Sequence, residues 1–173
     1  NRSALYSALV VWLLLSMRMA SLSAGTDFDW LGIPIPTEWL VPVRQWTVCM
    51  YSAATVALFS KLFRLELAAI GSQRLLTGLQ LAAVGLMVAC PLLSFEQILP
   101  VVWVCSTAGT GIMLYYLYRI LTRRFSAMAL WYGLSIATTL LASLNEVIAA
   151  AVGPQSALGS LNSVSAALAS ALF

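Results

Sequence analysis

The amino-acid sequence predicts an all-α fold, a polytopic bundle of about six transmembrane helices with both chain ends in the cytoplasm. Hydrophobic residues make up 61% of the 173 residues and charged residues only 9%, far below the quarter that is usual in soluble domains. The apolar residues come in runs of about twenty, the length that crosses a bilayer as a helix. Backbone groups in hydrocarbon must bond within the chain, and the unbroken runs favour helices over a barrel.

The breaks between these runs define the expected elements. We predict spanning helices at residues 4–24, 38–63, 72–92, 95–122, 126–151 and 156–173, and no strands. The loop from Gly25 to Thr37 is rich in turn-forming residues, and Thr37 is a candidate N-cap for the second helix. Pro91 ends the third span, and Ser94 to Gln97 has the spacing of a capping box before the fourth.

The domain boundaries follow from the same pattern. We expect one transmembrane domain, residues 1–173, within a longer protein, because the sequence starts at Asn1 without Met and stops at Phe173 inside an apolar stretch. The first apolar segment has the length of a signal peptide. Arg18 near its end and the lack of a small-residue cleavage pattern favour a retained span.

Basic residues set the expected orientation, because short cytoplasmic loops retain Lys and Arg. With alternating spans, one side collects seven cations: Arg2, Lys61, Arg64, Arg74, Arg119, Arg123 and Arg124. The other side has only Arg18 and Arg44, together with most of the acidic residues. The first side is therefore expected to be cytoplasmic, and the net charge of +3 reflects topology rather than nucleic-acid binding.

The residue types argue against catalysis and against a bound metal or cofactor. The sequence has no histidine, which removes imidazole zinc sites, serine–histidine dyads and histidine haem ligation. The three cysteines lack C-x-x-C spacing; a bridge between Cys90 and Cys105 is conceivable, and inert buried thiols are the simpler interpretation. We expect no enzymatic activity in this chain.

Polar residues just inside the outer boundary are the candidate ligand-binding or switch residues: Arg18, Arg44, Asn145 and Glu146. Charge at membrane depth is costly unless it is paired or wetted. One interpretation is an outward-facing pocket for an anionic ligand or a neighbouring carboxylate. The other is an Arg–Glu pair that only fixes helix register, with the long side chains reaching the headgroups.

Small residues recur at four-residue spacing, in the pairs Gly78/Ala82, Gly85/Ala89 and Gly133/Ala137 and in a longer row, Gly159, Ser163, Ala167 and Ala171. Such rows let helix backbones approach closely in lipid. Packing within the chain is the simpler interpretation. A homodimer through the last helix is the alternative.

Six stretches together carry a resemblance to a known family: Leu5 to Leu9, the Gly25 to Trp30 loop, Trp46, Phe59 to Arg64, Tyr115 to Arg124, and Leu130 to Gly133. In order and character they resemble the membrane core of bacterial seven-transmembrane receptors with diverse intracellular signalling modules. The similarity covers nearly the whole chain, as spans two to seven. It implies an extracytoplasmic sensor domain before the chain and a cytoplasmic effector after it, in one polypeptide of the bacterial inner membrane.

The expected function is therefore a receptor core that relays an outer signal to a cytoplasmic module. The basic residues Lys61, Arg64, Arg123 and Arg124 are the candidate cytoplasmic contacts. The alternative is the substrate-binding membrane subunit of a vitamin-type uptake transporter, which has this size and number of spans. A third class is an assembly subunit without a ligand.

Overall fold

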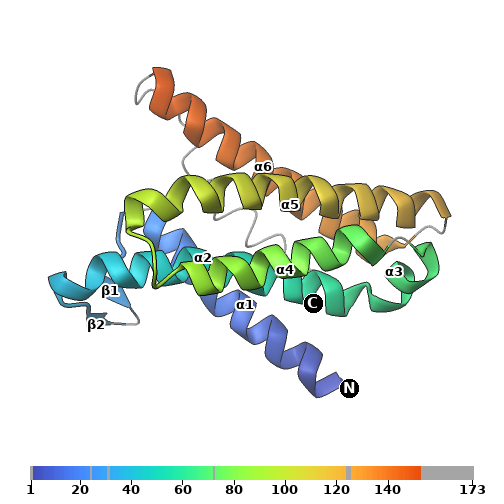
Figure 1. Ribbon diagram of the computed structural model, residues 1–173, viewed down its shortest axis with the longest axis horizontal. Coiled ribbons are helices and arrows are strands. Elements are labelled where there is room, and N and C mark those ends of the chain that lie inside the picture. Colours follow the sequence, from blue (N-terminus) through green and yellow to red (C-terminus); the bar gives the residue numbers. More distant parts are fainter. Residues whose placement is uncertain (1, 24, 31, 72, 124–125, 153–173) are drawn as a thin grey trace. The chain divides into compact units, whose positions relative to one another are not determined.

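The chain is built almost entirely of helices (Figure 1). A computed structural model describes residues 2–152 apart from 24, 31, 72 and 124–125, and leaves the side chains of 2, 23, 139 and 142–152 undescribed. The described part holds six helices: α1 (Arg2–Ser23), α2 (Thr37–Leu62), α3 (Arg64–Ile70), α4 (Gln73–Ala89), α5 (Phe95–Arg123) and α6 (Ala127–Val152). The chain divides within α5 into two compact units, residues 1–113 and 114–173.

The helix bounds confirm five of the predicted helices to within three residues. Residues 4–24, 38–63, 72–92, 95–122 and 126–151 were expected, and α1, α2, α4, α5 and α6 occupy these places. The sixth expected helix, 156–173, lies outside the described residues. The all-α class is confirmed, because long apolar runs satisfy their backbone polar groups only by coiling.

The segment after α2 forms a helix that the sequence analysis missed. Residues 64–70 were expected to be a loop, and they form α3 instead. Leu67 and Ile70 are buried on one face of this helix. The left-handed conformation of Gly71, with φ of 76°, ends it. Only two side chains of this short helix are buried, so the sequence contains no repeating apolar pattern from which a helix could be predicted.

The outer loop contains a strand pair, so the expectation of no strands was wrong. Strands β1 (Asp29–Trp30) and β2 (Ile33–Pro34) pair antiparallel, with Asp29 opposite Pro34 and Trp30 opposite Ile33. Gly32 adopts φ of 80° in the turn between them. The two-residue strands are too short to produce an alternating pattern in the sequence.

The helix starts show one correct and one wrong assignment. At the start of α5 the Ser94 backbone N–H donates to Gln97 Oε1 at 3.2 Å, which is the reciprocal half of the predicted capping box. Thr37 is not the N-cap of α2. Pro36 holds that position with ψ of 140°, and Thr37 is already helical, so its hydroxyl is not placed to cap the helix.

Two helices in the described part are long and apolar enough to cross a membrane, not about six. They are Ser3–Leu22 within α1 and the whole of α5. The charged residues Glu38, Arg44 and Lys61 lower the mean hydropathy of α2, and α4 has only 17 residues. Within α6 the apolar stretch among the described residues is Ala127–Thr138, which is shorter than a membrane span.

In the first unit α2 is the central helix and packs against both α1 and α4. Its Cys49 joins a buried cluster with Leu86 and Cys90 around the end of α4 and with Ile98 and Val102 of α5. In the second unit the end of α5 packs on the start of α6, where Leu117 Cδ1 approaches Gly133. The Gly133 row therefore serves packing within the chain, as expected.

Glycines on α4 and α5 differ in how closely they are packed. A methyl group added at Gly78 or Gly85 of α4 would meet no other atom within 4 Å, so these two glycines pack against nothing in the described part of the chain. On α5 a methyl group at Gly109 would lie 3.0 Å from Leu79 Cδ1, whereas at Gly111 it would meet nothing within 4 Å. Gly109 thus sets the approach of α4 and α5.

We expect Gly109→Ala to be less stable than Gly111→Ala by about 1 kcal/mol. Both substitutions gain helix propensity, but only the first forces Leu79 to move. The comparison is made by thermal unfolding of the two purified variants in the same detergent. Equal stabilities would show that Leu79 does not limit the approach of the two helices.

Candidate functional site

The outer loop folds back onto the end of α1. The Gly25 N–H donates to the Leu22 carbonyl and the Thr26 N–H to the Ser21 carbonyl, so both close the last turn of the helix. Gly25 has φ of 68°, a conformation that other residues adopt only at a cost. The chain therefore reverses at once, and the residue after Thr26, Asp27, comes to lie beside the last turns of α1.

Arg18 of α1 is buried, with 4% of its surface exposed, and it binds the backbone of this loop. Its Nη2 donates to the Asp27 carbonyl at 2.8 Å and its Nη1 faces the Asp29 carbonyl at 3.4 Å. The guanidinium carbon lies 5.4 Å from the centre of the Trp30 ring, within cation–π range. Its Nε is buried and has no hydrogen-bond partner among the described residues. Arg18 thus fixes the loop through main-chain oxygens.

Arg44 of α2 binds the Asp27 carboxylate in a two-pronged pair. The Arg44 Nε contacts Oδ2, and Nη2 donates to Oδ1 at 2.8 Å. Asp27 is 2% exposed, and about a third of the Arg44 side chain (34%) is exposed. Charge-assisted, two-pronged hydrogen bonds fix orientation as well as adding energy. Asp27 therefore joins α1, the outer loop and α2 through its carbonyl and its carboxylate.

The surroundings of Asp27 favour its ionised form. The hydrogen bond from Arg44 lowers the pKa of the Asp27 carboxyl below its usual 3.8, burial opposes this shift, and the charge of Arg44 adds to the lowering. The charge of Arg18 is the smallest of the causes. The pair is therefore intact at neutral pH and breaks only in strong acid.

The predicted outer residues have different outcomes. Arg18 and Arg44 both bind Asp27, which was expected only as a loop charge, and a ligand-binding or switch role for the two arginines stays a prediction. The signal available in the sequence was that Asp27 follows Arg18, an arginine within an apolar run, by nine positions. Asn145 and Glu146 lie in α6, and their side chains are outside the described part, so no partner is assigned to them.

The predicted inner residues lie at the ends of helices. Lys61, in the last turn of α2, points its Nζ at the Ala4 carbonyl of α1 at 3.5 Å. Arg64 is the first residue of α3 and is exposed. Arg123 is the last residue of α5, and Arg124 lies outside the described residues.

A polar seam between α1 and α2 was missed by sequence reasoning. Trp12 Nε1 donates to Thr55 Oγ1 at 3.0 Å, and Ser16 Oγ donates to the Trp12 carbonyl at 2.8 Å. The Tyr51 ring stacks on Trp12 with centroids 6.3 Å apart, and the Thr55 hydroxyl donates to the Tyr51 carbonyl at 2.8 Å. The signal was the four-residue spacing of Trp12 and Ser16 on one helix and of Tyr51 and Thr55 on the next.

A second missed contact joins α2 to the end of α4. Gln45 Nε2 donates to the carbonyls of Cys90 and Leu93, the latter at 2.8 Å, so it satisfies backbone oxygens left free where the helix stops. Cys49, Cys90 and Cys105 are all free thiols, so the conceivable Cys90–Cys105 bridge is absent. Among the described residues, no three His, Cys, Asp or Glu side chains are placed to hold a metal ion.

Comparison with known proteins adds no assignment. No protein family, no curated protein and no solved structure matched the chain. The resemblance to seven-transmembrane receptor cores therefore stays a prediction.

We expect Asp27→Asn to lower the free energy of unfolding by about 2 kcal/mol at neutral pH. Removing one partner of a fully buried ion pair costs about 3–5 kcal/mol, and the partial exposure of Arg44 reduces this. Because the folded pKa of Asp27 is lowered, this stabilisation is complete above the unfolded value of 3.8. It is lost as the pH falls below 3.8 through the folded pKa.

The measurement is thermal unfolding of both proteins in detergent from neutral pH to below 3.8. Asp29→Asn is the matched control, because it removes an exposed carboxylate from the same loop. A gap between wild type and Asp27→Asn that widens in acid, or an equal loss in the control, would contradict the assignment.

Proposed function

We propose that this chain is the membrane-embedded helical core of a receptor, which relays a signal from its outer loop to its cytoplasmic end. The membrane part of the proposal is supported by α1 and α5, which are long and apolar enough to cross a bilayer. It is also supported by the many large apolar side chains that face outward, among them Leu81 and Val84 of α4 and Val104 of α5, each more than 60% exposed. Lipid accepts such surfaces at no cost, whereas water does not.

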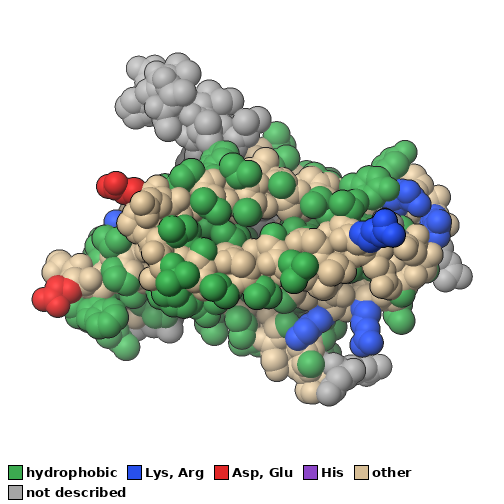
Figure 2. All heavy atoms as spheres, in the orientation of Figure 1, with side chains coloured by type: hydrophobic (Ala, Val, Ile, Leu, Met, Phe, Trp, Pro, Cys, Tyr) green, Lys and Arg blue, Asp and Glu red, His purple; other side chains and the backbone are tan. Residues whose placement is uncertain are grey.

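The proposed topology counts α2, α4, α6 and the predicted helix at residues 156–173 as spans in addition to α1 and α5, the two that meet the length and hydropathy of a span among the described residues. Both chain ends are proposed to lie in the cytoplasm of a bacterial cell, with the core in its inner membrane. In the first unit the basic residues Lys61, Arg64 and Arg74 lie at the end where α2 stops and α4 begins. Asp27, Asp29, Glu38 and Glu96 lie at the opposite ends of the helices, and Figure 2 shows this separation of charge. Under the positive-inside rule the basic end is cytoplasmic.

The relay is supported by one observation above all: the Asp27 pair makes α1, the outer loop and α2 a single connected body. The Trp12–Thr55 bond continues this connection in the middle of the two helices, and the contact of Lys61 with the Ala4 carbonyl continues it at their inner ends. A displacement of the loop is therefore transmitted along α1 and α2 together.

The relay needs two packings of the bundle that an outer ligand or sensor domain contacts differently. The ion pair is a suitable element for such a change, because an incoming anion or carboxylate competes with Asp27 for Arg44. The sensor and effector domains are proposed to belong to the same polypeptide, and the core itself is proposed to have no catalytic role and no cofactor.

The topology predicts which exposed positions reach the outside of the cell. In a Cys105→Ser background, Thr26→Cys in the outer loop should react with a membrane-impermeant maleimide in intact bacterial cells. Ala68→Cys in α3 should react only after the cells are permeabilised. Both positions are exposed, so access to the reagent depends on the side of the membrane. Labelling of Ala68→Cys in intact cells would refute the proposed orientation.

The relay predicts that breaking the outer pair changes the inner end of α2. Hydrogen exchange of the α3 amides, such as Leu67 N–H bonded to the Phe63 carbonyl, should change about fivefold in Asp27→Asn, the equivalent of a coupling of about 1 kcal/mol. Asp29→Asn should leave it unchanged. Identical exchange at α3 in wild type and both variants would show that the Asp27 pair only holds the loop in place and is not coupled to α3.

A further inference from the structure

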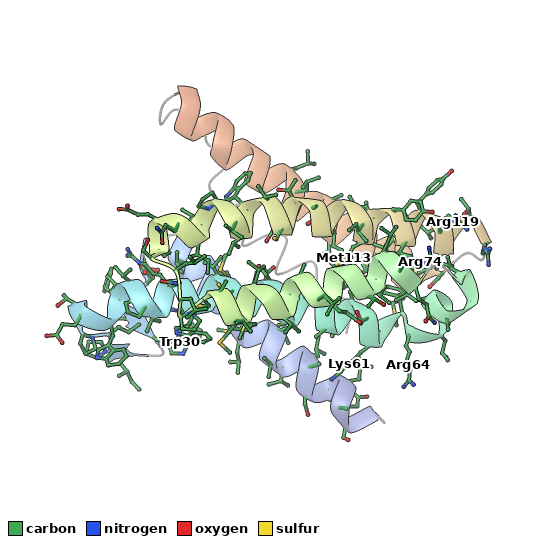
Figure 3. All side chains as sticks on the ribbon, viewed as in Figure 1. Trp30, Lys61, Arg64, Arg74, Met113 and Arg119 are labelled. Atoms are coloured by element: carbon green, nitrogen blue, oxygen red, sulfur yellow. The ribbon has the colours of Figure 1, made fainter. Side chains whose placement is uncertain are left out.

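Three basic side chains surround the turns that connect α2, α3 and α4. Lys61 stands in the last turn of α2, Arg64 begins α3, and Arg74 is the second residue of α4. All three are exposed. Figure 3 shows Lys61 and Arg64 projecting to the same side, with Arg74 well apart from them.

Intramolecular anions do not neutralise these cations. From Lys61 to Arg74 the sequence carries one acidic residue, Glu66, against three basic ones. Among the described residues the ion pair that forms is Arg44 with Asp27, so none of the three is paired with a carboxylate. The Lys61 ammonium donates one hydrogen bond to the Ala4 carbonyl, and its other N–H groups are available to an external anion.

In the proposed topology α3 lies at the level of the lipid headgroups. With seven residues it is about 10 Å long, far too short to cross the hydrocarbon core. Leu67 and Ile70 fix one face on the bundle, while Leu65 is 83% exposed directly beside Arg64. An exposed leucine next to an unpaired arginine is the pattern of an interfacial segment, in which the apolar chain enters the acyl region and the cation reaches the phosphate.

We propose that Lys61 and Arg64 form a binding site for the phosphate of an anionic phospholipid headgroup, with Leu65 against its acyl chains. This inference rests on the proposed membrane location of the chain. The occupant is a lipid rather than a soluble phosphate, because the site combines cations with an exposed apolar side chain. Basic residues at an anionic membrane surface each contribute enough to change affinity about fivefold.

The test is native mass spectrometry of the whole chain in detergent, titrated with phosphatidylglycerol, with phosphatidylcholine and with glycerol 3-phosphate. We expect phosphatidylglycerol to bind more tightly than phosphatidylcholine, and Lys61→Gln or Arg64→Gln each to weaken phosphatidylglycerol binding about fivefold. Arg119→Gln is the matched control. Arg119 is already engaged by the Tyr115 hydroxyl at 3.0 Å and by the Tyr115 ring, so its loss should weaken lipid binding less than the loss of Arg64 does.

Three results would overturn the site: equal affinity for the two lipids, an equal loss in Arg119→Gln, or glycerol 3-phosphate binding as tightly as the lipid. The titration in detergent does not depend on orientation in the cell. Failure of lipid binding with correct maleimide labelling would therefore remove this inference alone. Correct lipid binding with reversed labelling would remove the proposed topology and keep the site.

Discussion

The pair between the Asp27 carboxylate and the Arg44 guanidinium is the interaction on which the outer half of the first unit depends. Without it, α2 would carry an unpaired cation near its outer end and the loop a buried, unpaired carboxylate, both of which are expensive away from water. With it, the Asp27 carbonyl is held where Arg18 can bind it. One acidic residue therefore determines how the loop, α1 and α2 meet.

Directional polar contacts give the apolar bundle a defined register. Apolar side chains pack against lipid almost as well as against each other, so hydrophobicity alone does not fix how helices are placed. In this chain the Trp12–Thr55 bond aligns α1 with α2, and Gln45 binds the carbonyls at the end of α4. Ser52 and Ser106 hydrogen-bond between α2 and α5 at 3.2 Å. These contacts converge on α2, which explains its central place.

The two ends of the first unit treat charge in opposite ways. At the outer end Asp27 satisfies Arg44, so a competing anion has a defined contact to displace. At the inner end Arg64 and Arg74 have no acidic partner in the described residues and face outward. An ion pair within the chain is a contact that a signal can break, whereas cations without an acidic partner can bind an anion from outside the chain. The proposed relay and lipid site are therefore consequences of the same distribution of charge.

The sequence by itself determined the helical class and the approximate bounds of five helices, because hydropathy and turn residues act locally and add along the chain. It also singled out Arg18 and Arg44, since charge within an apolar run is visible without a structure. Only the tertiary structure decided that Asp27 is their partner, that residues 64–70 form a helix, and that two helices among the described residues meet the length and hydropathy of a span. The partner depends on how Gly25 reverses the chain, and a pairing made across a turn leaves no periodic pattern in the sequence.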